Sequence, residues 1–466
     1  MTTPTLPNNE SEKEKVLAIP TASAVLPNGE LVELVYDPVE RQTQFVRGTG
    51  ESWSYASVID TRPGERLVPY SPANNLLVHD VVLLPSGPED YGTEPELLAR
   101  IREFIHRYVD ISPVFEELSA YYVLLTWLYD CFHELPYLRV RGDYGSGKTR
   151  FLLVVGALCN KPIFASGAST TSPLFRIIDA FRGTLILDES DFRLSDERAE
   201  IVKILNNGNA KGFPVLRTEV NRSKEFDPRA YTVFGPKIVA TRGYFEDRAL
   251  ESRCLTEDMG QQRLRDDVPL NLDDRYREEA RGLRNQLLLF RLKHWTRSRE
   301  LTALPERGIE PRLRQIFAPF LSLIDDPEAH RRAIALLRAY QKDLVSDRAM
   351  ALEARILESI AALLKPETVS LRILDITTEL IARFGEDFER PVTPKWIGTT
   401  LRKRLALKPV QSRGIFILGP GELAKLPQLF EKYGLKEQNE EVTETPPPAS
   451  AGIEGDSASE ALPATA

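Results

Sequence analysis

Cysteine is scarce in this sequence: there are three among 466 residues, at Cys131, Cys159 and Cys254, and no CxxC pair occurs. This scarcity excludes a disulfide scaffold, a zinc finger and a cysteine-ligated iron–sulfur cluster, and it fits a reducing compartment. The chain also lacks an apolar run of the roughly 18 residues that a membrane-spanning helix needs. Its first residues lack a basic start followed by an apolar stretch. We therefore expect a cytoplasmic protein that has no membrane partner.

An excess of positive charge is absent as well. Lysine and arginine number 60 against 68 acidic residues, which gives a net charge of −8. A polycation that coats nucleic acid is thereby excluded, so any contact with nucleic acid must be local. Hydrophobic residues at 42% and charged residues at 27% are typical of globular protein, and a chain of this length predicts about three domains.

Composition and periodicity divide the chain into six segments. Both ends are polar without hydrophobic periodicity, which predicts disorder. Short alternating runs predict a β-rich module near the N-terminus, alternation of strands and helices then predicts a parallel sheet, and apolar stripes every three or four residues predict a helical region. The expected boundaries are 1–18 (disordered), 19–94 (β-rich module), 95–265 (α/β nucleotide-binding domain), 266–366 (helical domain), 367–436 (helix-turn-helix with a hairpin) and 437–466 (disordered tail).

A complete G-x-x-x-x-G-K-T motif follows the expected strand YLRVRG and precedes the apolar helix KTRFLLVVGAL. In such a loop successive N–H groups point at phosphate oxygens, and the helix N-terminus adds partial positive charge. The lysine is expected to reach the β- and γ-phosphates of ATP, and the threonine to hold Mg²⁺. The residues expected to bind the nucleotide are Gly142, Gly145, Ser146, Gly147, Lys148 and Thr149.

A second expected strand, GTLILDES, ends in two carboxylates about forty residues after the loop. Its unbroken apolar run predicts a central strand covered on both faces. Asp188 is expected to hold Mg²⁺, together with Thr149, and Glu189 to act as the base that orients the attacking water. The glutamate favours hydrolysis over transfer to a small acceptor, which makes a small-molecule kinase the less favoured alternative.

These two motifs, the later strand KIVATRG and the triplet Ser252-Arg253-Cys254 together resemble an AAA+ ATPase. The resemblance implies that Thr241 is the polar sensor after the second motif. It also implies that Arg253, with Arg248 as second choice, enters the site of a neighbouring subunit, where a guanidinium stabilises transition-state charge. In the helical region Arg312 and Arg314 are candidates for the family's second sensor, or else belong to a solvated helix face.

Between the second motif and the sensor strand, two β-like runs flank the turn NRSKE and predict a hairpin. AAA+ helicases related to superfamily 3 carry a similar hairpin that projects into the pore of a hexamer. By that resemblance basic side chains of this segment contact nucleic-acid phosphates, and an ordinary surface hairpin is the alternative because three acidic residues dilute the charge. The basic residues are Lys211, Arg217, Arg222 and Lys224, and the acidic ones are Glu219, Glu225 and Asp227.

No acidic residue occurs between Pro391 and Gly421, where six side chains are basic. A Thr-Pro cap predicts a helix anchored by a stripe of Ile397, Leu401 and Leu405, followed by two short strands. The pattern resembles a winged helix-turn-helix domain, which implies DNA binding, with protein binding as the alternative. Trp396, beside the stripe, is expected in the core. The candidate DNA-binding residues are Lys395, Arg402, Lys403, Arg404, Lys408 and Arg413, with Arg217 of the hairpin.

The sequence thus predicts an α/β protein with a P-loop AAA+ core, a helical lid domain, a small N-terminal β-rich module and a C-terminal winged helix. The expected activity is Mg²⁺-dependent ATP hydrolysis by a homo-oligomeric ring that acts as a DNA helicase or replication-type motor of a mobile element. The resemblance implies a hexameric ring. The alternative is a nucleotide-switched DNA-binding regulator that separates no strands.

Overall fold

The computed structural model describes residues 16–50, 52–166, 171–188, 196–220, 226–245, 247–260, 264–295, 309–349, 352–385, 391–412 and 414–435. By its contacts the chain separates into two units, Met1–Gln341 and Lys342–Ala466, and each is described by itself. Within these described ranges no helix is long and apolar enough to cross a membrane.

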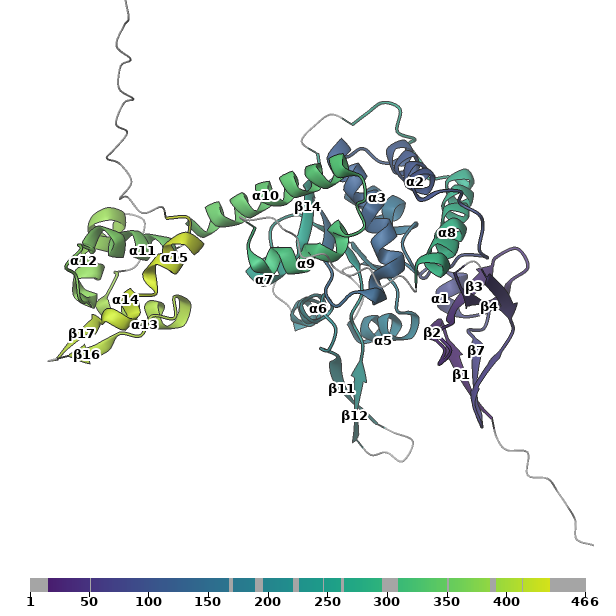
Figure 1. Cartoon of the computed structure of the whole chain (residues 1–466), viewed down its shortest axis with the longest axis horizontal. Coiled ribbons are helices and arrows are strands. Elements are labelled where there is room, and N and C mark those ends of the chain that lie inside the picture. The colour runs from purple at the N-terminus through teal and green to yellow at the C-terminus, as the bar shows by residue number, and fades with distance from the viewer. Residues whose placement is uncertain are drawn as a thin grey trace, which may run out of the picture. The chain divides into compact units, whose positions relative to one another are not determined.

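A five-stranded sheet forms the centre of the first unit (Figure 1). Its strands lie in the order β14-β8-β13-β10-β9, and each strand is parallel to its neighbours, as the alternation of strands and helices predicts. Because all strands run in one direction, their carboxyl ends lie at one edge of the sheet. The strands are β8 (Tyr137–Arg141), β9 (Ile163–Ser166), β10 (Leu185–Asp188), β13 (Lys237–Thr241) and β14 (Cys254–Asp258).

Helices pack on both faces of this sheet. On one face α4 comes so close that a Cβ at Gly156 would lie 3.1 Å from the side chain of Ile186. On the other face α6 and α7 contribute Ile201, Leu205 and Leu250 to a buried apolar cluster. The helices of this unit are α2 (Glu94–Tyr108), α3 (Pro113–Leu128), α4 (Lys148–Gly156), α5 (Thr171–Phe181), α6 (Asp196–Asn207), α7 (Arg248–Glu251), α8 (Asp274–His294), α9 (Pro311–Leu321) and α10 (Pro327–Ala349), the last extending past Gln341.

Two small sheets, ordered β2-β3-β4-β5 and β1-β7-β6, form the N-terminal part of the first unit. Their apolar residues share one core with β9 and α5, and Val82 bridges to Ile163 at the edge of the central sheet. The N-terminal sheets are therefore packed onto the edge of the central five-stranded sheet. The elements are β1 (Leu17–Thr21), β2 (Ser23–Val25), β3 (Leu31–Asp37), β4 (Gln42–Thr49), β5 (Ser52–Ala56), β6 (Ile59–Arg62), β7 (Glu65–Pro69) and the short helix α1 (Asn75–Val78), so the first strand begins inside the range 1–18 that was expected to be disordered.

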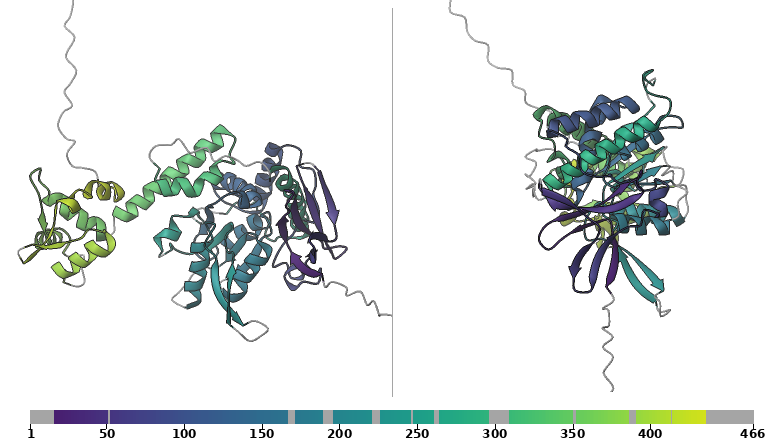
Figure 2. Two further views of the ribbon diagram at one scale, coloured as in Figure 1. Left: turned by 60° about the horizontal axis from the view of Figure 1, so that its bottom comes forward. Right: turned by 90° about the vertical axis from the view of Figure 1, so that its right-hand side faces the viewer.

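The expected hairpin is present as β11 (Val215–Val220) paired with β12 (Phe226–Tyr231), and it projects away from the central sheet (Figures 1 and 2). Alternate residues of each strand point to opposite faces. One face is exposed and uncharged, and we call it the outer face of the hairpin. It consists of Leu216, Thr218, Val220, Phe226, Pro228 and Ala230, which pair across the two strands.

The second unit contains helix α11, a short strand, two helices and a hairpin in chain order, with an antiparallel sheet β15-β17-β16. The stripe of Ile397, Leu401 and Leu405 is buried among residues of α11 and α12. Helix α11 lies in the range 266–366 that the sequence assigns to the lid, yet it contributes to this core. The elements are α11 (Leu352–Leu363), β15 (Leu371–Arg372), α12 (Ile373–Phe384), α13 (Pro394–Arg404), β16 (Val410–Ser412), β17 (Ile415–Leu418), α14 (Pro420–Leu423) and α15 (Leu426–Lys432).

Candidate functional site

The glycine-rich loop joins the carboxyl end of β8 to the first turn of α4. Gly145 and Gly147 have φ angles of 74° and 90°, a left-handed conformation that glycine adopts without strain. Gly147 is the N-cap of α4 and provides no side-chain cap, so the first N–H groups of the helix face the loop. The loop therefore has the backbone geometry of an anion site.

Lys148 lies across this loop. Its ammonium group donates to the carbonyl oxygens of Gly142 and Asp143 at 2.6 and 2.7 Å. The side chain of Ser146 also donates to Asp143 O, at 2.8 Å. The lysine is consequently held at the place where the loop can receive phosphate oxygens.

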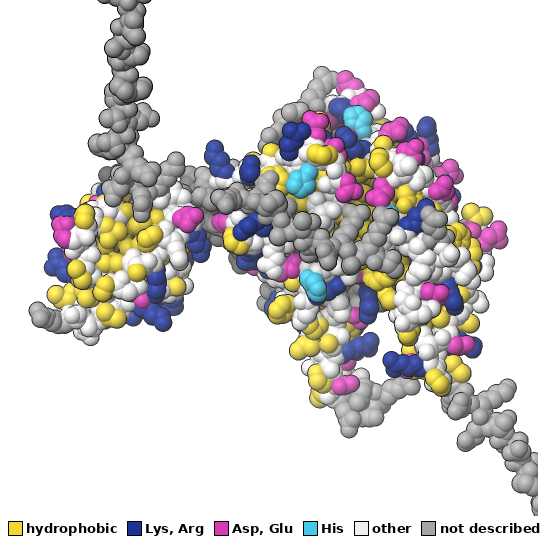
Figure 3. Space-filling model, viewed as in Figure 1, with side chains coloured by type: hydrophobic (Ala, Val, Ile, Leu, Met, Phe, Trp, Pro, Cys, Tyr) yellow, Lys and Arg dark blue, Asp and Glu magenta, His cyan; other side chains and the backbone are white. Residues whose placement is uncertain are grey.

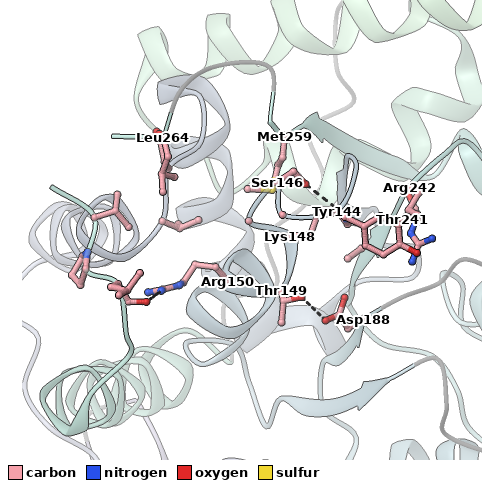
Figure 4. Close-up of a pocket in the computed structure, with 18 residues that line it drawn as sticks. Tyr144, Ser146, Lys148, Thr149, Arg150, Asp188, Thr241, Arg242, Met259 and Leu264 are labelled. Carbon is pink, nitrogen blue, oxygen red and sulfur yellow. Dashed lines mark hydrogen bonds between the residues drawn. The ribbon is translucent and has the colours of Figure 1, made fainter. Parts of the chain in front are cut away.

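The two residues expected to hold Mg²⁺ are in direct contact. Thr149 Oγ1 donates to Asp188 Oδ2 at 2.7 Å, which joins the start of α4 to the end of β10 (Figure 4). In the described part of the chain no cluster of three His, Cys, Asp or Glu side chains has metal-binding geometry. A hydroxyl and a carboxylate fit Mg²⁺, because this ion commonly uses one or two protein oxygens and completes its shell with water and phosphate.

A cavity of about 430 Å³ opens over the loop and is polar at one end and apolar at the other. Lys148, Thr149 and Asp188 line it at the carboxyl edge of the sheet, and Leu264 lies across the cavity from Thr241 (Figure 4). The volume falls within the usual range of small-molecule pockets. A ligand with a charged phosphate chain and a planar apolar group matches this division.

Thr241 lies at the carboxyl end of β13, between the loop and the acidic strand. Its side chain is buried at 4% exposure, and among the described residues its Oγ1 has no hydrogen-bond partner. Its carbonyl oxygen accepts a bond of 3.2 Å from the N–H of Gly142. A buried hydroxyl without a partner is costly unless a ligand satisfies it, so this group is available to a molecule in the cavity.

Several expected catalytic residues lie away from the cavity or outside the description. Glu189 lies outside the described residues, as does the side chain of Arg248. Arg253 precedes β14 at the amino edge of the sheet, about 13 Å of strand from the loop, and it donates to Asn206 Oδ1. Burial lowers the pKa of its guanidinium. Arg253 does not line the cavity of its own chain.

The second-sensor candidates Arg312 and Arg314 belong to α9, and neither lines the cavity. Arg312 is close enough to Arg253 for its charge to lower the pKa of that guanidinium further. Helix α9 therefore brings no arginine to the cavity of its own chain.

Sequence reasoning missed several residues of this cavity. Tyr144 and Arg242 lie at its polar end, with the guanidinium 3.6 Å from the ring centre. Arg150, whose guanidinium donates to Leu270 O, lines the opposite side of the cavity together with Leu264. Only Tyr144 and Arg150 carry a local signal, since they flank the glycines and lysine of the motif.

Two basic residues of the hairpin segment that the structure describes, Lys211 and Arg217, contact other parts of the protein. Arg217 pairs with Glu200 on α6 and lies over the ring of Phe175, and Lys211 donates to Asp130 O at 2.7 Å. Arg222, Lys224 and Glu225 lie outside the described residues. The outer face of the hairpin carries no charge instead, and Figure 3 shows hydrophobic side chains on it.

In the second unit α13 begins as expected, with Thr393 Oγ1 accepting from the N–H of Trp396 at 3.3 Å. The expectation that Trp396 belongs to the core is wrong, because 38% of its surface is exposed. The basic residues Lys395, Arg402, Lys403 and Lys408 are exposed, and Figure 3 shows Lys and Arg gathered around this helix. Arg404 is exposed as well and pairs with Glu353 at 3.1 Å, and Arg413 lies outside the described residues.

No family model and no curated protein matches this chain. Among solved structures, SCCmec type IV Cch, an active helicase, has 10% identity and a TM-score of 0.39 over 88% of this chain and 80% of its own. The apo C-terminal region of NrS-1 has 11% identity and a TM-score of 0.36 over 83% and 96%. The ORC1 protein of Aeropyrum pernix in complex with DNA has 15% identity and a TM-score of 0.22 over 71% and 96%. At these TM-scores the three likenesses do not establish the function of this chain.

Proposed function

We propose that this protein is a P-loop ATPase of the AAA+ type that hydrolyses ATP with Mg²⁺ and acts on DNA as a helicase or replication-type motor. The observation that carries the proposal is the 2.7 Å bond between Thr149 and Asp188, which unites the glycine-rich loop with the acidic strand. The strand order supports it, since β13 separates the loop strand β8 from β10, an arrangement that resembles the AAA+ core.

In this proposal each residue at the polar end of the cavity has a separate task. The loop N–H groups and Lys148 bind the β- and γ-phosphates, while Thr149 and Asp188 hold the metal ion. Bound Mg²⁺ neutralises charge that develops on the phosphate oxygens. Glu189, next in the chain after Asp188, orients the attacking water, and the hydroxyl of Thr241 donates to that water or to the terminal phosphate.

Arg253 acts in this scheme on the cavity of a second copy in a homo-oligomeric ring. Its place at the amino edge of the sheet, far from its own loop, supports action in trans. A guanidinium supplied by a neighbour stabilises the charge of the transition state and can raise turnover by roughly three to five orders of magnitude.

DNA contacts are assigned to the second unit. Its order of helix, strand, two helices and hairpin resembles a winged helix-turn-helix domain, in which α13 is the helix that enters the major groove. The exposed basic residues Lys395, Arg402 and Lys403 share one side of α13, where they can neutralise phosphates.

The same surface favours a second candidate function, a nucleotide-switched regulator that binds duplex DNA without separating strands. Purified protein should be assayed for ATP turnover without DNA, with single-stranded DNA and with duplex DNA, beside a strand-displacement assay. DNA-stimulated turnover with displacement supports the motor, whereas duplex binding with slow unstimulated turnover supports the regulator. Lys148→Ala is the control: a variant that hydrolyses ATP like the parent would refute the nucleotide site itself.

A further inference from the structure

Arg242 directly follows Thr241 and lines the cavity at the carboxyl end of β13. Leu187 of β10 pairs with Val239 of β13, so Arg242 lies beyond the level of Asp188 at the same edge of the sheet. This is the polar end of the cavity, across from Leu264 (Figure 4). A second cationic side chain thus accompanies Lys148 where the phosphate chain is proposed to bind.

Tyr144 of the loop holds this arginine by its ring. The guanidinium carbon lies 3.6 Å from the ring centre, a close cation–π contact. The backbone adds a second link, since Gly142 N–H donates to the carbonyl oxygen of Thr241. Loop and sensor strand are therefore joined at two adjacent points, and the direction of the arginine depends on the loop that binds the phosphates.

We propose that Arg242 contacts the terminal phosphate of a nucleoside triphosphate bound in its own chain, and that Tyr144 positions it. This inference rests on the proposed nucleotide site. Arg242 of the β13 end would then be the arginine that acts on the nucleotide of its own chain. Helix α9 provides no such arginine, because Arg312 and Arg314 lie outside the cavity. A planar guanidinium can donate two parallel hydrogen bonds to phosphate oxygens, which a lysine cannot.

The test compares ATP with ADP, since only ATP has the terminal phosphate. For Arg242→Ala the affinity for MgATP should fall about 10- to 100-fold, the range for one charge-assisted hydrogen bond, while the affinity for MgADP stays at the parent's value. Arg242→Lys should recover part of the ATP affinity because it keeps the charge. Equal losses for both nucleotides, or no loss for either, would overturn the assignment.

A matched pair of tyrosine variants tests the positioning role. Tyr144 and Tyr244 are both exposed, and each stacks on an arginine at this edge of the sheet, but Arg141, the partner of Tyr244, lies outside the cavity. Tyr144→Ala should lower the ratio of ATP to ADP affinity, and Tyr144→Phe should restore it. Tyr244→Ala should leave the ratio unchanged. The positioning role is refuted if both alanine variants change the ratio equally.

Mixing experiments separate action in cis from action in trans. Arg253→Ala protein mixed with Glu189→Gln protein should regain turnover, because some hybrid interfaces contain both intact groups. Arg242→Ala mixed with Glu189→Gln should regain none, since both defects fall on the same side of every site, and a regain would overturn the cis assignment. If Lys148→Ala still binds ATP like the parent, the nucleotide site fails as a whole. If Lys148→Ala loses binding and Arg242→Ala retains the parent's ATP and ADP affinities, only the role of Arg242 fails.

Discussion

Glu33 is the best position at which to test how the N-terminal sheets are attached to the core. Its carboxylate, 3% exposed, accepts from Lys161 Nζ at 2.6 Å and from Arg291 Nε at 2.7 Å, and both cations are at most 2% exposed. Burial alone would raise the pKa of Glu33, but the two cations outweigh it and hold the pKa below its ordinary value. The three residues come from β3, the connection before β9, and α8, so one buried charge joins three distant segments.

Glu33→Gln keeps the shape of the side chain and leaves the buried Lys161 without a counterion. Arg291 retains Asp130, at 2.6 Å, so the loss falls mainly on the lysine. Breaking a buried ion pair from one side costs about 3–5 kcal/mol, and we expect a loss of this size in the free energy of unfolding at neutral pH. Urea titration followed by tryptophan fluorescence measures it.

The pH dependence has a definite sign. Because the folded pKa of Glu33 is lowered, its stabilisation is fully present above the ordinary value of 4.5 and is lost as the pH falls through the folded pKa. The difference in the free energy of unfolding between the parent and Glu33→Gln should therefore become smaller at acidic pH. Lys161→Met added to Glu33→Gln should restore part of the stability, since it removes the unpaired charge.

The exposed pair Asp60 and Arg66 provides the control, at 2.6 Å between the charged atoms. Asp60→Asn should hardly change the unfolding midpoint because solvent screens such pairs. The role of the buried ion pair is refuted if Glu33→Gln lowers the free energy of unfolding no more than Asp60→Asn does. It is also refuted if Lys161→Met, added to Glu33→Gln, lowers the free energy of unfolding further.

Two other predictions concern lysines and arginines elsewhere. Burial lowers the pKa of Lys237 to about 7, so between pH 7 and 10 the unfolded chain binds a proton that the folded chain does not. The free energy of unfolding should therefore rise with pH over this range. Lys237→Met should remove this rise, as measured by urea titrations at pH 7 and pH 10. Neutralising Lys395, Arg402 and Lys403 together should weaken duplex binding and reduce the slope of log affinity against log salt by about 0.9 per lost phosphate contact, as measured by fluorescence anisotropy. Arg404→Ala should change the slope less, because Arg404 is paired with Glu353 at 3.1 Å, and an unchanged slope in the triple variant would contradict direct DNA binding by α13.

The parts of the site that the sequence predicts are local in the chain. The glycine-rich loop is contiguous, and its position between a strand and a helix follows from the residues on each side. The position of Asp188 could be predicted because it ends an unbroken apolar run, and the structure places its carboxylate in hydrogen-bond contact with Thr149. That both residues hold one ion stays a prediction. In each case a few neighbouring residues contain the whole signal.

The contact between Tyr144 and Arg242 could not be predicted in this way. It depends on β13 lying next to β8, and alternation of strands and helices predicts a parallel sheet without the order of its strands. The exposure of Trp396 could not be predicted for a different reason. Successive residues of a helix point about 100° apart, so a residue next to the buried Ile397 need not be buried itself.

The outer face of the hairpin has a thermodynamic consequence. Its side chains are uncharged, with Leu216 69% and Phe226 80% exposed, while Arg217 is turned to α6. A molecule that covers this face removes apolar surface from water, so its binding has a negative heat-capacity change. The affinity of such a molecule depends little on salt. A molecule bound through the basic side of α13 releases counterions, so its affinity falls steeply with salt. Calorimetry at several temperatures and ionic strengths would therefore report separately on the two surfaces of a single chain.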